Sequence, residues 1–314
     1  MPYRRDSRGI GSIFASARGP ACQTPCSMVA ILGGLGAALS WAIATLAPSR
    51  SSRMISPISV LGWVMAVGLA TAIVPALVAR PIALDLPMLT ALVVVGLSHN
   101  LGLLLAYGAL SIGRVSIVAP IVATEGALAA VLSIVFGEPL AAPSGLLLAA
   151  IAAGVVLAAR ERAADRPDAA TIAPSQNRRA AMLAISAALV FSVGLLLAGR
   201  LGAAGVPPAW IMVVSRTIGV LLIVLPLLAT RRLRLTRPAL PLVLVAGVLE
   251  VLGGAIYVVA ASESVAVAAI LASQFAAIAA LGGFFLFGER LQRLQLVGVA
   301  TVAVGVTLLA ALQA

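Results

Sequence analysis

The chain is a series of long apolar runs separated by short polar connections. A helix needs about 17–25 apolar residues to cross the hydrocarbon core of a bilayer, and ten runs reach that length. Their apolar residues are consecutive rather than alternating, which excludes the strands of a membrane β-barrel. The pattern therefore predicts an all-helical membrane protein with ten spans: Met28–Leu46, Ile58–Val78, Met88–Leu110, Val115–Phe136, Pro143–Ala159, Ala180–Ala198, Trp210–Leu228, Leu240–Ala261, Val265–Phe287 and Leu294–Leu312.

Two polar segments divide the chain into four parts. Residues 1–27 form a polar tail with four arginines and no apolar core, which is not typical of a secretory signal. Residues 160–179, rich in charge and proline, form the only long connection between runs. We therefore expect a first five-span unit at 28–159, a linker at 160–179 and a second five-span unit at 180–314. Translation from Met28 is an alternative start, so we expect the tail to be dispensable.

Composition supports the membrane interpretation. The chain is 62% hydrophobic and 10% charged, whereas soluble domains carry about 25% charged residues. This excludes a soluble enzyme, a disordered chain and a disulfide scaffold. All 21 basic residues are arginines spread through the connections, which favours lipid head groups over nucleic acid as their partners. Cys22 and Cys26 lie in the tail with nothing to complete a metal site, so we expect no metal and no cofactor.

The two five-span units repeat one another. When the chain is shifted by 151 residues, glycine, proline and charged positions coincide without a gap from Pro57 to Val155. These residue types mark kinks, close helix contacts and helix ends, so their coincidence carries more weight than matches of alanine or leucine. The matched pairs include Pro57 with Pro208, Gly68 with Gly219, Pro75 with Pro226, Arg80 with Arg231, Gly96 with Gly247, Gly102 with Gly253 and Gly154 with Gly305.

The odd number of spans in each unit sets their relative direction. After five crossings the chain is on the other side of the membrane, so the second unit crosses in the opposite sense. The predicted fold is therefore an inverted repeat, a recurring plan of secondary transporters. In such proteins, exchange of conformation between the halves opens a shared site to alternate sides.

The fourth run of each unit ends in a similar motif, Phe136–Pro139 in the first and Phe287–Arg290 in the second. Each motif holds a Gly-Glu pair, whose carboxylates are Glu138 and Glu289. With the ten spans, the repeat and Pro120, the chain resembles the EamA branch of the drug/metabolite transporter superfamily. The resemblance implies ten helices in two inverted repeats and export of amino acids, other small metabolites or amphipathic drugs.

Four ionisable residues lie within predicted spans: Glu250, Glu125, His99 and Arg216. Such groups cost about 2.5–3.5 kcal/mol at a bilayer centre on insertion scales, and they usually face a cavity or a partner. His99 coincides with Glu250 under the 151-residue shift, so we expect the two at similar depth beside a pseudo-twofold axis. We interpret both glutamates as functional. His99 fits equally well as a functional group or as a neutral ring satisfied by Asn100 or a backbone carbonyl.

Other polar residues are candidates for the same pathway. Tyr257 shares a helical face with Glu250, and Tyr107 shares one with His99. Gln274 in the ninth run is a candidate cavity donor. Glu138 and Glu289 each follow a glycine at a helix end, so we interpret them as helix-end residues that fix a turn or pair with loop arginines.

Arg216 decides which carboxylate is the better proton carrier. It either binds an anionic substrate or neutralises Glu125 or Glu250, and we favour the ion pair because an uncompensated buried arginine is costlier. Burial favours the neutral form of a carboxyl group, and a nearby arginine opposes this. We therefore expect the carboxylate more distant from Arg216 to carry the proton. We choose Glu250, with Glu125 as substrate contact or second carrier.

The sequence favours a secondary transporter over two alternatives. It has no phosphate-cradling loop and no lysine, so uphill transport must use an ion gradient, and titratable groups at mid-span favour protons. We expect a proton-coupled exporter in the plasma membrane, as in a bacterial inner membrane, whose partners are a small-molecule substrate, protons and lipid, with a homodimer left open. The alternatives are a membrane enzyme that uses Glu125, Glu250 and His99 as acid–base groups, and a passive channel.

The expected orientation of the termini is in conflict. If both are cytoplasmic, as the resemblance implies, six tail and loop arginines face the cytoplasm and fourteen face the other side. The preference of arginine for cytoplasmic loops predicts the opposite orientation, and both alternatives stay open.

Overall fold

The computed structural model describes residues 28–51, 54–80, 82, 85–112, 118, 121–139, 142–158, 174–278 and 293–311. Within these ranges the chain forms helices and no strand. The polar tail 1–27, Pro120, Glu289 and residues 160–173 of the predicted linker lie outside them. The helices are α2 (Met28–Ser51), α3 (Pro57–Val78), α4 (Leu86–Ile112), α6 (Glu125–Val135), α7 (Ala142–Ala158), α8 (Pro174–Ala203), α9 (Pro208–Gly219), η3 (Val220–Val224), α10 (Leu225–Ala229), α11 (Leu240–Glu263), α12 (Val265–Ala272) and α14 (Arg293–Ala311).

Six helical segments in the described ranges are long and apolar enough to cross a bilayer, and they begin at residues 28, 57, 86, 178, 208 and 240. Three shorter apolar helices accompany them. Large apolar side chains face outward, as at Leu77 and Val78, which are 80% and 86% exposed. A helix bundle with an apolar outer surface is a multi-pass membrane protein, as the sequence predicts.

Two predicted spans are interrupted by turns. The run Val115–Phe136 contains a turn at residues 123–124, just before α6, and the run Val265–Phe287 contains one at residues 273–274, just after α12. In both turns a hydroxyl donates to the carbonyl oxygen three residues earlier, from Thr124 at 2.6 Å and from Ser273 at 2.8 Å. Such hydrogen bonds compete with the helical pattern, and hydropathy does not register them.

The sixth span begins earlier than its apolar run predicts. α8 starts at Pro174, inside the segment expected to be linker, because proline suits the first turn of a helix and the polar residues after it continue the helix. The seventh span continues from α9 to α10 through the single π-helical turn η3.

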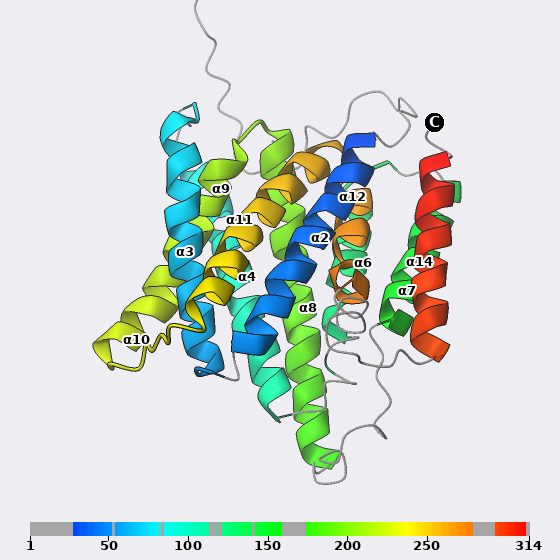
Figure 1. Cartoon of the computed structure of the whole chain (residues 1–314). Coiled ribbons are helices and arrows are strands. Elements are labelled where there is room, and N and C mark those ends of the chain that lie inside the picture. Colours follow the sequence, from blue (N-terminus) through cyan, green and yellow to red (C-terminus); the bar gives the residue numbers. More distant parts are fainter. Residues whose placement is uncertain are drawn as a thin grey trace, which may run out of the picture.

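Packing joins the first half of the chain to the second (Figure 1). α2 packs along α11, α4 along α8, α3 on α9, α6 on α12, and α7 on α14. Figure 1 shows α3 running upward, whereas the chain runs downward through α9 and α10. Glycines permit the close approaches: a Cβ on Gly96 would lie 2.5 Å from Ile218, and one on Gly247 would lie 2.6 Å from Val67.

Candidate functional site

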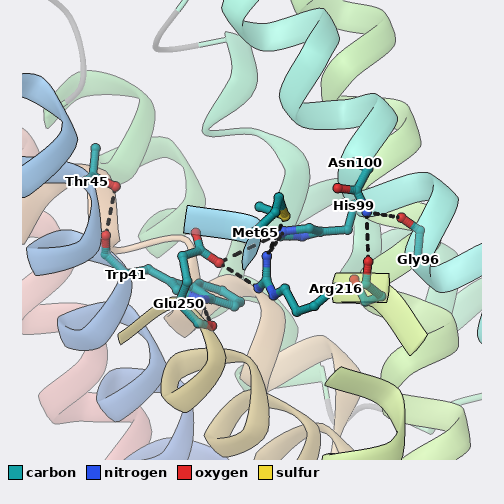
Figure 2. A network of polar contacts seen from close by, with 9 residues as sticks. Trp41, Thr45, Met65, Gly96, His99, Asn100, Arg216 and Glu250 are labelled. Atoms are coloured by element: carbon teal, nitrogen blue, oxygen red, sulfur yellow. Dashed lines mark hydrogen bonds and ion pairs between the residues drawn. The ribbon is translucent and has the colours of Figure 1, made fainter. Parts of the chain in front are cut away.

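Arg216 is the centre of a polar network between α3, α4, α9 and α11 (Figure 2). Its side chain is only 2% exposed. Nη2 donates to Oε2 of Glu250 at 3.0 Å, and Nη1 contacts Nε2 of His99 at 3.0 Å and Sδ of Met65 at 3.4 Å. Gly68 makes room for it, since a Cβ there would lie 3.1 Å from Cδ of Arg216. Four helices thus bring a guanidinium, a carboxylate and an imidazole together inside the bundle.

The contact with Arg216 fixes the form of His99. A guanidinium has only donors, so Nε2 of His99 accepts and the ring proton lies on Nδ1 of a neutral imidazole. Oε2 of Glu250 lies 3.9 Å from the same ring nitrogen. Arg216 and Glu250 therefore balance each other's charge, and His99 adds none.

Glu250 and His99 form the accessible side of the network. Their side chains are 21% and 25% exposed. Oε1 of Glu250 accepts no hydrogen bond from any residue in the described ranges. The indole nitrogen of Trp41 donates to the backbone carbonyl of Glu250 at 3.4 Å, and the ring of Phe191 meets His99 edge-on with centroids 6.2 Å apart. A molecule that reaches the network meets a carboxylate oxygen, an imidazole and aromatic rings, with Arg216 behind them.

Asn100 ties helices together beside the network. Its Nδ2 donates to the carbonyl oxygens of Gly96, at 2.8 Å, and of Ser215, at 3.0 Å, which joins α4 to α9 (Figure 2). Its Oδ1 is buried and has no partner among the described residues. The sequence offered Asn100 or a backbone carbonyl as the partner of a neutral His99. The contact observed is with Arg216 instead.

Glu125 and Gln274 lie where the two interrupted spans cross. Glu125 is the first residue of α6, is 8% exposed, and makes no hydrogen bond or ion pair with any residue in the described part of the chain. Next to it, a Cβ on Gly126 would lie 2.8 Å from Cβ of Ser273. Gln274 is 1% exposed; its Nε2 donates to the carbonyl of Ile270 at 3.1 Å, and its Oε1 is without a partner in those ranges. The crossing therefore buries a carboxyl group and an amide oxygen that are both unpaired.

The two predicted tyrosines have different surroundings. Tyr257 is 2% exposed, and its hydroxyl donates to the carbonyl of Leu195 at 3.0 Å, which joins α11 to α8. Its ring lies 5.8 Å from that of Trp41. Tyr107 packs in the apolar cluster that contains Met65. Within the described residues neither tyrosine hydrogen-bonds to Arg216, Glu250 or His99.

Glu138 lies outside the network, at the end of α6. Its carboxylate accepts hydrogen bonds from the Ser264 hydroxyl and the Ala266 N–H, at the start of α12. These contacts fit one of the two roles expected for Glu138, which is to fix a turn. The turn that it fixes lies in the second half of the chain, just before α12. No described arginine pairs with Glu138, and Glu289 lies outside the described ranges.

Residues 28–160 match the EamA-like transporter family. The match covers less than half of the chain and confirms, over those residues, the resemblance predicted from the motif and the repeat. A solved structure titled "Crystal structure of protein" is similar in fold, with a TM-score of 0.71 and 16% identity over 90% of this chain and 96% of that chain. No curated protein matches the chain.

The premise for choosing Glu250 as the proton carrier does not hold in the structure. Glu250 is the carboxylate paired with Arg216 at 3.0 Å, and Glu125 has no partner among the described residues. Spacing along the chain could not decide between them, because both glutamates lie mid-span and helical period does not fix which face meets Arg216. The sequence held one signal for the surroundings of Arg216. The 151-residue shift aligns Met65 with Arg216, and these two residues are in contact in the structure.

An apolar groove of about 490 Å³ lies elsewhere on the protein, between α2 and α11. Its lining is entirely apolar, and much of it is outward-facing, as at Leu32, which is 62% exposed. Such a surface suits lipid chains rather than a polar substrate. The groove is lined by Met28, Val29, Leu32, Gly33, Pro208, Ala255, Ile256 and Val259.

Proposed function

We propose that the protein is a proton-coupled secondary transporter that exports a small molecule carrying an ammonium group, by alternating access across the plasma membrane. The observation that carries the proposal is the network of Arg216, Glu250 and His99. Helices from both halves of the chain supply it, and its accessible side is polar. Ionisable groups inside a helix bundle mark substrate and proton pathways.

Contacts between equivalent residues support an inverted repeat. Under the 151-residue shift Met65 is equivalent to Arg216, and His99 to Glu250. The first pair meets at 3.4 Å and the second at 3.9 Å. Two related halves bring equivalent residues into contact only near the axis that relates them, so the network is expected to lie on that axis.

Contacts away from the axis recur in pairs, which also supports ten spans in two halves. A Cβ on Gly102 would lie 2.7 Å from the Phe191 ring, and one on Gly253 would lie 2.7 Å from the Trp41 ring. The glycines are equivalent at a shift of 151 and the aromatic residues at 150. Likewise α2 packs along α11 as α4 packs along α8. Exchange of conformation between such halves would open the network to each side in turn.

The accessible side of the network favours a cationic group of the substrate. Oε1 of Glu250 is free to accept hydrogen bonds from an ammonium group, and the rings of Trp41 and Phe191 lie close by to stabilise a cation. An anion would have to displace Glu250 from the buried Arg216. Glu250 therefore binds the substrate in this proposal.

Glu125 carries the proton in this proposal. It can gain a proton without losing a partner, whereas protonation of Glu250 would leave Arg216 buried and uncompensated. Burial favours the neutral form of a carboxyl group, and a cation brought close to it favours the ionised form. Substrate binding thus promotes proton release, which is antiport.

Transport by the purified protein in liposomes tests the proposal. The probe is a mixture of labelled primary amines added outside vesicles with an acidic interior, and protein-free vesicles give the passive accumulation of weak bases. We expect a saturable initial rate of uptake above that of the protein-free vesicles, and exchange of labelled for unlabelled amine. Leak without exchange would show a channel, and chemical conversion of the amines would show an enzyme.

A further inference from the structure

Backbone geometry at the end of α6 places Glu138. Gly137 has φ +93°, in the left-handed region, and its N–H donates to the carbonyl of Ile134 at 2.9 Å. The N–H of Glu138 donates to the carbonyl of Ser133 at 2.9 Å, which completes a Schellman ending. A Cβ on Gly137 would meet nothing within 4 Å, so the backbone conformation, and not lack of space, favours glycine here.

From this position Glu138 reaches the second half of the chain. Its Oε1 accepts from the Ser264 hydroxyl at 2.5 Å and from the Ala266 N–H at 3.2 Å. Ser264 is the N-cap of α12, and its Oγ accepts from the Val267 N–H at 3.3 Å. Two of the free N–H groups at the start of α12 are thus satisfied, and a carboxylate faces the positive end of the helix dipole.

Ser264 is also the single non-helical residue between α11 and α12. Its backbone is extended, with φ −154° and ψ 112°, and its N–H donates to the carbonyl of Ala260 at 3.4 Å. The angle between a 24-residue helix and an 8-residue helix therefore depends on very few dihedral angles. Junctions of this kind act as hinges in domain and gate motions.

α8 packs against the same end of the bundle. Nη2 of Arg200 donates to the carbonyl of Phe136 at 3.2 Å, just before Glu138. A Cβ on Gly202 would lie 2.8 Å from the carbonyl oxygen of Val258, so α8 and α11 are in direct contact. Val258 and Ala261 at this contact are 1% and 2% exposed, so α8 and α11 pack closely here.

We propose that Glu138 is a positioning residue for transport: its carboxylate clamps the α11–α12 junction and holds this end of the bundle closed in one state of the cycle. The proposal rests on the alternating access proposed above. Glu138 is partly exposed, so water can take the place of Ser264 and Ala266 when the clamp opens. The first Gly-Glu motif then has a role in gating as well as in helix termination.

Cysteine accessibility tests the clamp without a substrate. In a full-length C22S/C26S background, A261C reports on the clamped end, and A239C reports on the other end of α11. Both alanines are buried, at 2% and 0% exposed, and they lie about 33 Å apart along α11. The rate of labelling by a polar maleimide is measured for each in detergent, where both ends are accessible to reagent.

We expect E138A to raise the labelling rate at A261C at least tenfold and to leave the rate at A239C unchanged or lower. E138Q keeps the shape but loses the charge, and S264A loses the hydroxyl donor; each should give a smaller rise at A261C alone. E263Q is the matched control, because Glu263 is exposed, adjacent to Ser264, and without a partner among the described residues. It should change neither rate.

Unchanged labelling at A261C in E138A, E138Q and S264A would overturn the clamp. An equal rise at both reporters would also overturn it, because that pattern shows general loss of stability. If the labelling is as expected but the protein shows no exchange in liposomes, the clamp is supported and the proposed transport is refuted.

Discussion

At the residue scale, the ion pair of Arg216 and Glu250 determines how a substitution of either residue changes the stability of the protein. Burying charges is costly, and a buried pair repays the cost only when both partners are present. The equivalent position in the first half holds Met65, so one half of the fold already accommodates an uncharged side chain there.

Glu250→Gln should lower the free energy of unfolding by about 3–5 kcal/mol, because Arg216 stays buried without a countercharge. Adding R216M should restore most of this loss, since no unpaired charge remains and methionine is the residue of the other half. Thermal unfolding in detergent measures both variants. A stable E250Q protein, or a double variant no more stable than E250Q, would contradict the ion pair.

The sequence predicted the members of the network but not its pairings. Glu250, Glu125, His99 and Arg216 stand out because ionisable residues are rare in apolar runs. Which carboxylate meets Arg216 depends on the rotation of α9 against α11, and helical period leaves that rotation free. The unpaired Oδ1 of Asn100 likewise follows from a contact between α4 and α9.

At the element scale, helix ends were easier to predict than helix interruptions. Proline and glycine mark the ends in the sequence, as at Gly137. The turns at residues 123–124 and 273–274 lie within apolar runs, where the hydroxyls of Thr124 and Ser273 bond to backbone carbonyls, and hydropathy gives no sign of them. The crossing of α6 and α12 depends on these turns and on Gly126.

Gly126→Ala should lower stability by about 1–3 kcal/mol, because its methyl group would overlap the Ala269 carbonyl oxygen and lie 2.8 Å from Cβ of Ser273. The matched control is G36A, whose methyl group would lie at ordinary van der Waals distance, 3.5 Å, from Cγ2 of Ile256, and which gains helix propensity. Thermal unfolding of the two variants should separate them. Equal stability would show that α6 and α12 cross less closely than described.

At the scale of the whole molecule, contacts in the structure follow the internal repeat. Gly96 approaches Ile218 and Gly247 approaches Val67, and the shift that aligns the two glycines also aligns Val67 with Ile218. A repeat gives relations between halves, but it does not give the side of the membrane on which each end lies.

The inverted repeat predicts that the connections after the first span of each half lie on opposite sides of the membrane. M54C follows α2 and A204C follows α8, and both positions are exposed. In a C22S/C26S background, an impermeant maleimide applied to intact cells should label one of them, and the other only after permeabilisation. Labelling of both from the same side would refute the inversion.

The most direct test of the transport mechanism compares the wild-type protein with E125Q in liposomes. E125Q removes the titratable group at a site with no partner among the described residues, so the variant should fold and should still exchange labelled for unlabelled amine. It should lose the initial rate of net amine uptake above that of protein-free vesicles with an acidic interior, which the wild-type protein and E263Q should show. Equal initial rates of net uptake by E125Q and the wild-type protein would contradict proton coupling through Glu125.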